Sequence, residues 1–136
     1  IQAYEGDHKS YINTSREILR AVGNYVCDNL RSNNVPINRP QGGFYLMPEF
    51  IDAKFKSSSE MCDEILKKTG VVLLPGSDFG FDKKRMIARL SFTDFDGEIF
   101  MREYQKSNLI DNKLIKKLAP KVVSGVDNLK KWSESI

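Results

Sequence analysis

Apolar residues recur at a spacing of three and four along residues 10–30, which places them on one face of a helix. This apolar stripe consists of Tyr11, Ile12, Ile18, Leu19, Val22, Tyr25, Val26 and Leu30. The polar residues 1–9 before it predict an irregular lead-in. Asparagine tolerates the left-handed conformation and proline bars a further turn, so residues 33–36 predict the end of the helix.

Three short apolar runs predict strands at residues 44–47, 71–74 and 86–92. The run at 71–74 is continuously apolar and contains β-branched residues, which is typical of a strand buried on both faces. Pro75 and Gly76 end that run, and a charged loop precedes the third one. The third run carries an arginine in its middle.

A capping signature predicts a short helix between the first two runs. Ser57 is followed three residues later by Glu60, which is the spacing of a capping box. Gly70 suits the position just beyond the end of this helix. The predicted buried face of the helix comprises Met61, Ile65 and Leu66.

Further helices are predicted after the third run. Residues 94–97 form a turn with helix-capping chemistry, and Pro120 suits the first turn of the last helix. The apolar residues that define these helices are Ile99, Phe100 and Tyr104, then Ile110, Leu114, Ile115 and Leu118, and finally Val122, Val123, Val126, Leu129 and Trp132.

The order helix, strand, helix, strand, strand and then helices predicts an α+β fold. In this fold, helices pack on a small mixed or antiparallel sheet. A chain of 136 residues has the length of one domain and can bury a core without disulfides. The predicted organisation is a single domain over residues 1–136.

Charge and cysteine content narrow the possible partners and surroundings. Lys and Arg number 21 against 18 Asp and Glu, a net charge of +3 that is interspersed and does not predict nucleic-acid binding. No apolar run approaches the ~20 residues of a membrane span, so we expect a soluble, cytoplasmic protein. Cys27 and Cys62 match no disulfide framework and predict free thiols. The chain opens at Ile1 without a signal peptide, and we expect it to be a piece of a longer protein.

Most residues that could carry chemistry have a simpler structural interpretation. His8 is the only histidine, which excludes a histidine-based triad or a multi-histidine metal site. Cys62 predicts a small buried hydrophobe rather than a nucleophile. The double glycine at residues 42–43 lacks a phosphate-binding pattern and predicts a turn. Asp94 and Asp96 could pair as acid and base, but their place before a helix favours capping. We therefore predict no catalytic residue and no metal site in this chain.

Arg89 is the exception among the polar residues. Strand alternation places it on the same face as Ile87 and Ser91, in an otherwise apolar run. Because burial of an unpaired guanidinium is costly, Arg89 must reach an anion or water. A planar guanidinium binds a carboxylate through two parallel hydrogen bonds, as a substrate anion needs. The alternative is an arginine that extends to the sheet edge or pairs with a local Asp.

Three motifs lie in order along the chain. Residues 40–46 read PQGGFYL, residues 70–80 read GVVLLPGSDFG, and residues 87–92 read IARLSF. They resemble the PxGGFYL, GVxxxPGSxFG and xxRLSF segments of the class I and II (fold-type-I) aminotransferases, the aspartate aminotransferase family. Residues 15–20 lie where that family has the long helix that enters its small domain. The resemblance covers nearly the whole chain and is loosest over residues 98–112.

This resemblance implies an enzyme that moves an amino group between an amino acid and a 2-oxo acid with pyridoxal phosphate. In the family, the arginine that matches Arg89 binds the α-carboxylate of the substrate, so Arg89 is the expected substrate-binding residue. Phe44, which follows the double glycine, either lines the substrate pocket or packs in the core.

The same resemblance implies what lies outside this chain. The family's Schiff-base lysine, the aspartate at the pyridinium nitrogen and most phosphate ligands belong to a large domain whose motifs are not in this sequence. We therefore expect this chain to be the C-terminal small domain, with no pyridoxal phosphate bound to it and no activity alone. Its partners would be its own large domain and a second copy of the full enzyme, with no nucleic acid and no membrane.

Two other interpretations stay open at this point. A fold-type-I lyase or synthase that acts on amino acids would share these motifs and the arginine. A free-standing interaction module would use the same fold without catalysis. The reading frame upstream of Ile1, and a Ser-x-x-Lys-type segment in it, would distinguish them.

Overall fold

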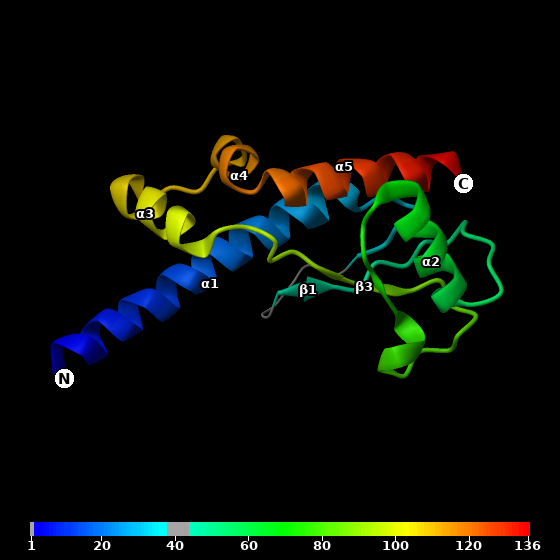
Figure 1. The fold of residues 1–136 in the computed structure, drawn as a ribbon, viewed down its shortest axis with the longest axis horizontal. Helices are drawn as coiled ribbons and strands as arrows, with labels where there is room; N and C mark the ends of the chain where they lie inside the picture. Colours follow the sequence, from blue (N-terminus) through cyan, green and yellow to red (C-terminus); the bar gives the residue numbers. More distant parts are fainter. Residues whose placement is uncertain (1, 38–43) are drawn as a thin grey trace.

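Over residues 2–37 and 44–136, which the computed structural model describes, the chain forms five α-helices, one 3-10 helix and a three-stranded sheet (Figure 1). Side chains are described from Tyr11 onward within these ranges. The predicted α+β class is confirmed by this arrangement.

The longest element is helix α1, Gln2–Leu30. Ile18, Val22 and Val26 from the predicted apolar stripe are buried, and the helix ends where the sequence predicts. The predicted irregular lead-in is wrong for residues 2–9, which continue the helix. Once a helix is nucleated, each further residue adds a backbone hydrogen bond, so a polar segment without proline can extend it.

The sheet consists of β1 (Tyr45–Leu46), β2 (Leu74–Pro75) and β3 (Ala88–Ser91), in the order β1-β3-β2. Both pairings are antiparallel. The three predicted runs therefore lie in one sheet, as expected, but each regular strand is shorter than its apolar run. A sheet this small depends on the helices packed against it, since an isolated short hairpin is marginal in water.

The register of the sheet places β3 between two partners. Tyr45 pairs with Ser91 on one side, and Leu74 pairs with Arg89 on the other. Along β3, Ala88 and Leu90 are buried, while Arg89 is half-buried and Ser91 is exposed. One face of the sheet therefore packs on the core and the other is open. Alternation along a strand produces this division.

Helix α2, Ser58–Thr69, has the predicted caps. The Ser57 hydroxyl accepts a hydrogen bond from the Glu60 N–H at 3.1 Å, and Gly70 closes the helix with φ of 76°. The Glu60 carboxylate accepts from the backbone N–H of Lys56 at 2.7 Å, one residue before the position of a standard capping box. Local signals were sufficient to place both ends of this helix.

Some apolar positions predicted to be buried are exposed. Val72 is 70% exposed and Leu74 is 40% exposed, so burial of residues 71–74 on both faces is wrong. The reason is that β2 lies at the edge of the sheet: in this run Leu73 is buried and Val71 packs against the core, while the other two side chains are exposed. Leu66 is also 45% exposed, because α2 buries a narrower stripe than predicted.

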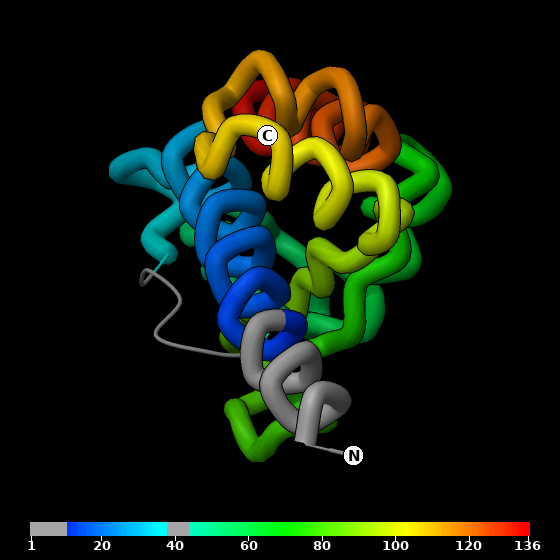
Figure 2. The backbone as a smooth tube through the Cα atoms, turned by 90° about the vertical axis from the view of Figure 1, so that its left-hand side faces the viewer, coloured from blue at the N-terminus to red at the C-terminus, as the bar shows by residue number. Residues whose placement is uncertain are grey.

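Helices α3 (Gly97–Ser107), α4 (Asn112–Leu118) and α5 (Pro120–Ser135) lie together along one side of α1 (Figures 1 and 2). The Asp96 carboxylate caps α3 by accepting from the N–H groups of Glu98 and Ile99. Both this cap and the proline at the start of α5 agree with the prediction.

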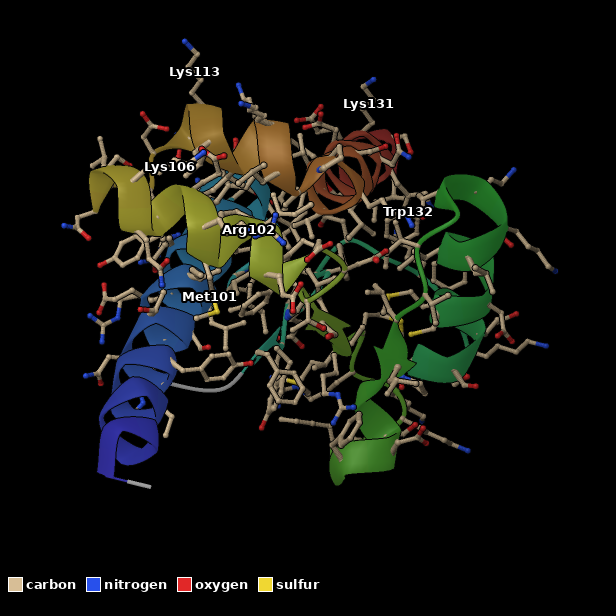
Figure 3. All side chains as sticks on the ribbon, turned by 60° about the vertical axis from the view of Figure 1, so that its left-hand side comes forward. Met101, Arg102, Lys106, Lys113, Lys131 and Trp132 are labelled. Carbon is tan, nitrogen blue, oxygen red and sulfur yellow. The ribbon has the colours of Figure 1, made fainter. Side chains whose placement is uncertain are left out.

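Helix α5 joins the core through Trp132. Its ring packs edge to face on Phe50, with centroids 5.4 Å apart, and stacks on Phe55 at 6.3 Å. Lys131, one residue earlier, points away from the body of the molecule (Figure 3). Cys27 and Cys62 are both buried and free, as the sequence predicts. Among the described helices, none has the length and apolar character needed to cross a membrane.

Candidate functional site

Arg89 lies on the open face of the sheet, in the central strand. Its register partner on β2 is Leu74, and the flanking residues Ala88 and Leu90 point into the core. The side chain is half-buried, so part of it is covered and part reaches the surface. This placement agrees with the alternation predicted from the sequence.

Two aromatic rings cover the guanidinium of Arg89. The guanidinium carbon lies 4.4 Å from the ring centre of Phe79 and 5.2 Å from that of Tyr45. Tyr45 comes from β1, on one side of β3, and Phe79 follows β2, on the other side. A cation over an aromatic face is attracted by the ring quadrupole, so both contacts stabilise the charged side chain.

Phe79 ends a tight 3-10 turn, η1 (Gly76–Phe79), that is held against β3. The Gly76 N–H donates to the Ile87 carbonyl oxygen at 2.7 Å. A Cβ atom at position 76 would lie 2.9 Å from that oxygen, so the approach requires glycine. Gly80 then closes the turn with φ of 93°, a conformation that favours glycine.

A buried serine ties the same turn to α2. Ser58 is fully buried, and its hydroxyl lies 3.3 Å from the hydroxyl of Ser77 and 3.4 Å from the Ser77 N–H. The ring of Phe79 is therefore carried by a turn that is held from both β3 and α2.

A second arginine near β3 shows a different arrangement. Arg85 donates from Nε and Nη2 to the two carboxylate oxygens of Glu49, at 3.2 and 3.1 Å. These hydrogen bonds and the Glu49 charge raise the pKa of Arg85. The ring centre of Phe81 lies 5.6 Å from its guanidinium carbon. Arg85 is thus engaged through the edge of its guanidinium, which is a structural pairing.

Arg89 lacks such a pairing. No Asp or Glu side chain in the described part of the chain forms an ion pair with it. The guanidinium carbon lies over the rings of Tyr45 and Phe79, and the N–H donors of a guanidinium lie in the plane of the group. Arg89 therefore has the chemistry of a receptor for one carboxylate.

Phe44 borders this arrangement. Its side chain is 50% exposed, and its ring meets Tyr45 edge to face at 6.1 Å. The interpretation of Phe44 as a packed core aromatic is therefore wrong, because it lies just outside the covered part of the sheet. Its place in a substrate pocket stays a prediction. The double glycine at residues 42–43 lies outside the described residues.

Other candidates from the sequence are structural. Cys62 is buried, and burial raises the pKa of its thiol to about 11, with smaller contributions from Asp63 and Asp78. A thiol with this pKa is protonated at neutral pH and is a poor nucleophile. Asp96 caps α3, as predicted. The side chain of His8 lies outside the described residues, and those that are described contain no His, Cys, Asp and Glu cluster suited to a metal.

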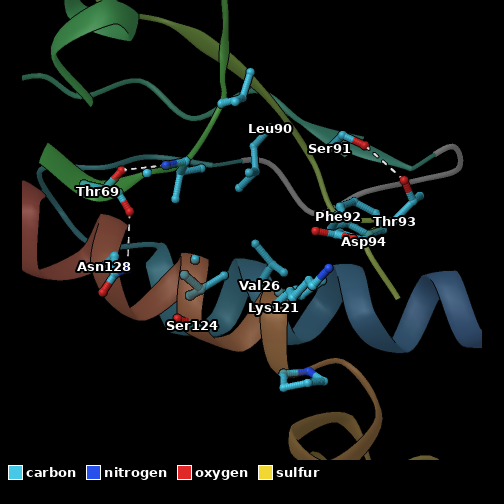
Figure 4. Close-up of a pocket in the computed structure, with 17 residues that line it drawn as sticks. Val26, Thr69, Leu90, Ser91, Phe92, Thr93, Asp94, Lys121, Ser124 and Asn128 are labelled. Atoms are coloured by element: carbon cyan, nitrogen blue, oxygen red, sulfur yellow. Dashed lines mark hydrogen bonds between the residues drawn. The ribbon is translucent and has the colours of Figure 1, made fainter. Parts of the chain in front are cut away.

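A cavity of about 790 Å³ lies between β3 and α5 (Figure 4). Leu90, Asp94, Lys121 and Ser124 are among its lining residues. Thr69 lines it as well, and its polar groups are bonded within the protein, to the Val71 N–H and the Asn128 side chain (Figure 4). Arg89 does not line this cavity, so the two features are separate.

The lysines test whether this chain could hold pyridoxal phosphate. A Schiff-base lysine needs a desolvated or positively charged setting that lowers its pKa. Every lysine whose side chain the structure describes is exposed. These residues therefore do not fit the cofactor.

Sequence reasoning singled out Arg89 as a candidate but did not single out Tyr45 and Phe79, whose rings contact it. Both residues belong to the motifs quoted above: Tyr45 to FYL and Phe79 to GSDFG. Their contact with Arg89 depends on sheet register and on the course of η1, which no local pattern specifies.

Comparisons with known proteins point to one family. The model of the family described as "Aminotransferase class I and II" matches residues 1–96. An aspartate aminotransferase from Sulfolobus acidocaldarius is 28% identical over 85 residues, which cover 60% of this chain.

Solved structures of two similar proteins have the same fold. An alanine aminotransferase from Pyrococcus furiosus matches with a TM-score of 0.60 and 18% identity over 94% of this chain. An aromatic aminotransferase from Pyrococcus horikoshii matches with a TM-score of 0.54 and 20% identity over 98% of it. The chain spans 21% of the curated relative and 26% and 27% of the two solved chains.

Proposed function

This chain belongs to the class I and II aminotransferase family, and from that premise we propose that it is the C-terminal, substrate-carboxylate-binding domain of a longer enzyme. That enzyme transfers an amino group between an amino acid and a 2-oxo acid with pyridoxal phosphate. The cofactor is held by a large domain that the chain itself does not contain. The full enzyme acts as a homodimer.

The observation that carries this proposal is the state of Arg89. Its guanidinium is held at the open face of the sheet by two rings, and no carboxylate of the described chain is paired with it. Arg85, four residues earlier in the chain, has its own carboxylate, so the difference between the two arginines is specific. A planar guanidinium whose N–H donors are not engaged by a carboxylate suits an α-carboxylate, which accepts two parallel hydrogen bonds.

The substrate class follows from what the named relatives share. Their names refer to aspartate, alanine and aromatic amino acids, whose side chains differ but whose α-carboxylate is common. A group in this domain that binds the common carboxylate serves every such substrate. We assign that role to Arg89 and place Phe44 at the rim of the same pocket.

Arg89 contributes by orientation in this proposal. Two hydrogen bonds to a carboxylate fix both the position and the plane of the group that bears it. The bonds at the neighbouring Cα atom are then held in one direction relative to the rest of the active site. Such positioning removes rotational freedom before the reaction and lowers its barrier.

The test uses the complete enzyme encoded by the gene that contains this chain. We expect Arg89→Ala to lower kcat/KM for an amino acid, because a charge-assisted bidentate contact is lost. The loss of transition-state stabilisation should be about 2–4 kcal/mol. Arg89→Lys should recover part of the loss, since the lysine ammonium keeps the charge but cannot form the two parallel hydrogen bonds of a planar guanidinium. Arg102→Ala is the control, because Arg102 is exposed on α3.

Product analysis separates the proposed function from its rivals. A transfer reaction forms one new amino acid for each 2-oxo acid consumed, whereas a lyase or synthase needs no 2-oxo acceptor. A reading frame without a large domain would favour the free-standing module. If Arg89→Ala leaves kcat/KM within about twofold, the carboxylate role of Arg89 is wrong.

A further inference from the structure

We infer that Tyr45 and Phe79 are positioning residues for Arg89, and that they hold its guanidinium by the faces so that its edge is presented to the substrate carboxylate. This inference rests on the proposed function and extends it to two residues that touch the arginine. The structural basis is the pair of distances from the guanidinium carbon to the two ring centres, 4.4 Å for Phe79 and 5.2 Å for Tyr45.

The geometry of a guanidinium explains why rings suit this purpose. Its five N–H donors lie in one plane, and its two faces carry no donor. An aromatic ring is attracted to the cation through the face, so it stabilises the charge and leaves the donors free. A carboxylate partner would instead occupy the donors, as Glu49 does on Arg85.

The two rings approach from opposite sides of β3. Tyr45 is placed by the pairing of β1 with β3, where it lies opposite Ser91. Phe79 is placed by η1, which Gly76 brings into hydrogen-bond contact with Ile87. The backbone that carries each ring therefore has its own support, separate from the Arg89 side chain.

The rings also remain open to a ligand. Tyr45 is 45% exposed and Phe79 is 40% exposed, although both are large apolar side chains that could have been buried. Arginine loses much rotamer freedom when it is fixed, and that loss weakens binding if it occurs only when substrate arrives. If the two rings restrict the Arg89 side chain before substrate arrives, less rotamer entropy is lost on binding. We therefore expect tighter binding of the carboxylate.

The first experiment measures the contact in the 136-residue chain by NMR. A ring over the guanidinium shifts the Arg89 Nε–H proton upfield through its ring current. We expect this shift to be reduced in Phe79→Leu, where the Tyr45 ring remains, and retained in Phe79→Tyr, with the amide spectrum confirming that each variant is folded. Phe81→Leu is the matched control and should move the Arg85 signal only. An Arg89 signal at the position of exposed Arg102 in the wild type would overturn the inference.

The second experiment measures carboxylate binding in the complete enzyme. Propionate has a carboxylate and no amino group, so its competitive inhibition reports binding without reaction. We expect Phe79→Leu and Tyr45→Leu each to raise the propionate inhibition constant and the amino-acid KM about fivefold, with kcat within twofold. Phe79→Tyr and Tyr45→Phe should restore wild-type binding, and Phe81→Leu should leave it unchanged.

The outcomes of this experiment separate the inference from the proposed function. If Arg89→Ala weakens propionate binding but both leucine variants bind it as the wild type does, the positioning role is wrong and the proposed function stands. If Arg89→Ala also leaves binding unchanged, the proposed function is wrong as well. A loss of kcat with unchanged KM in the leucine variants would indicate a role other than holding Arg89 and would overturn the inference.

Discussion

The N–H of Gly76 donates to the carbonyl oxygen of Ile87 at 2.7 Å, which brings the turn after β2 into direct contact with the residue that precedes β3. The space between them has no room for a side chain. A Cβ at position 76 would also lie 3.0 Å from the Ile87 Cβ. This contact sets the course of η1 and therefore the place of Phe79 over Arg89.

We predict that Gly76→Ala lowers the free energy of unfolding by about 1–3 kcal/mol, because the added methyl forces the turn away from β3. Gly97→Ala is the control, since no atom lies within 4 Å of a Cβ at that position in α3. That control should be neutral or slightly stabilising, as alanine is the better helix former. Urea unfolding of both variants measures the difference. Equal stability of Gly76→Ala and wild type would show that the turn can relax freely.

Local chemistry explains which parts of the fold could be predicted from the sequence. Each cap of α2 is a hydrogen bond between residues three or four positions apart. Ser57 with Glu60 therefore predicted the start of the helix, and Gly70 predicted its end. The same holds for Asp96 before α3 and Pro120 at the start of α5. A cap needs no information about the rest of the fold, and for that reason these predictions succeeded.

Features that depend on distant neighbours were not predictable. Residues 71–74 are all apolar, yet Val72 is exposed because β2 lies at the sheet edge and only one of its faces is covered. A run of four apolar residues does not specify which neighbours it will have. The contacts of Arg89 with Tyr45 and Phe79 likewise follow from register and turn geometry, so the sequence indicated the arginine but not its surroundings.

The buried thiol of Cys62 predicts a loss of stability in alkaline solution. Its pKa is raised from 9.0 to about 11 in the folded chain, mainly by burial. Between these two values, the unfolded chain loses the proton while the folded chain keeps it. Stability contributed by this group is therefore fully present below about pH 9 and is lost as the pH rises toward 11.

We predict that the free energy of unfolding falls by about 1–2 kcal/mol more in wild type than in Cys62→Ala between pH 9 and 11. Comparison with this variant removes the contribution of tyrosines such as Tyr25, whose pKa is also raised by burial. Denaturant unfolding at several pH values provides the measurement. Parallel pH profiles of the two proteins would contradict the prediction.

Pyridoxal phosphate provides a direct test of the exposed lysines. We predict that borohydride reduction of a mixture of this chain and pyridoxal phosphate labels several lysines weakly and none stoichiometrically. The reason is that every described lysine side chain is exposed, so none lies in the desolvated setting that activates a Schiff-base lysine. Peptide mapping by mass spectrometry identifies the labelled positions. One stoichiometrically labelled lysine would show that the chain carries its own cofactor site.

Helix α5 lies beyond the residues that the family model matches, yet its apolar face is part of the core. Val126 and Leu129 are buried, and Trp132 contacts two aromatic rings from the segment between β1 and α2. These contacts join the end of the chain to its middle. Residues 97–136 are therefore an integral part of the domain rather than an appendage to it.

We predict that Trp132→Ala lowers the free energy of unfolding by about 3–5 kcal/mol, because it removes a large buried ring and leaves a cavity beside Phe50 and Phe55. Trp132→Phe should recover a large part of this loss, since a smaller ring can still meet Phe50 edge to face. Lys131→Ala is the matched control from the adjacent exposed position, where a change within about 0.5 kcal/mol is expected. Urea denaturation followed by circular dichroism measures all three variants. If Trp132→Ala is as stable as Lys131→Ala, α5 does not contribute to the core and the aromatic contacts are without consequence for folding.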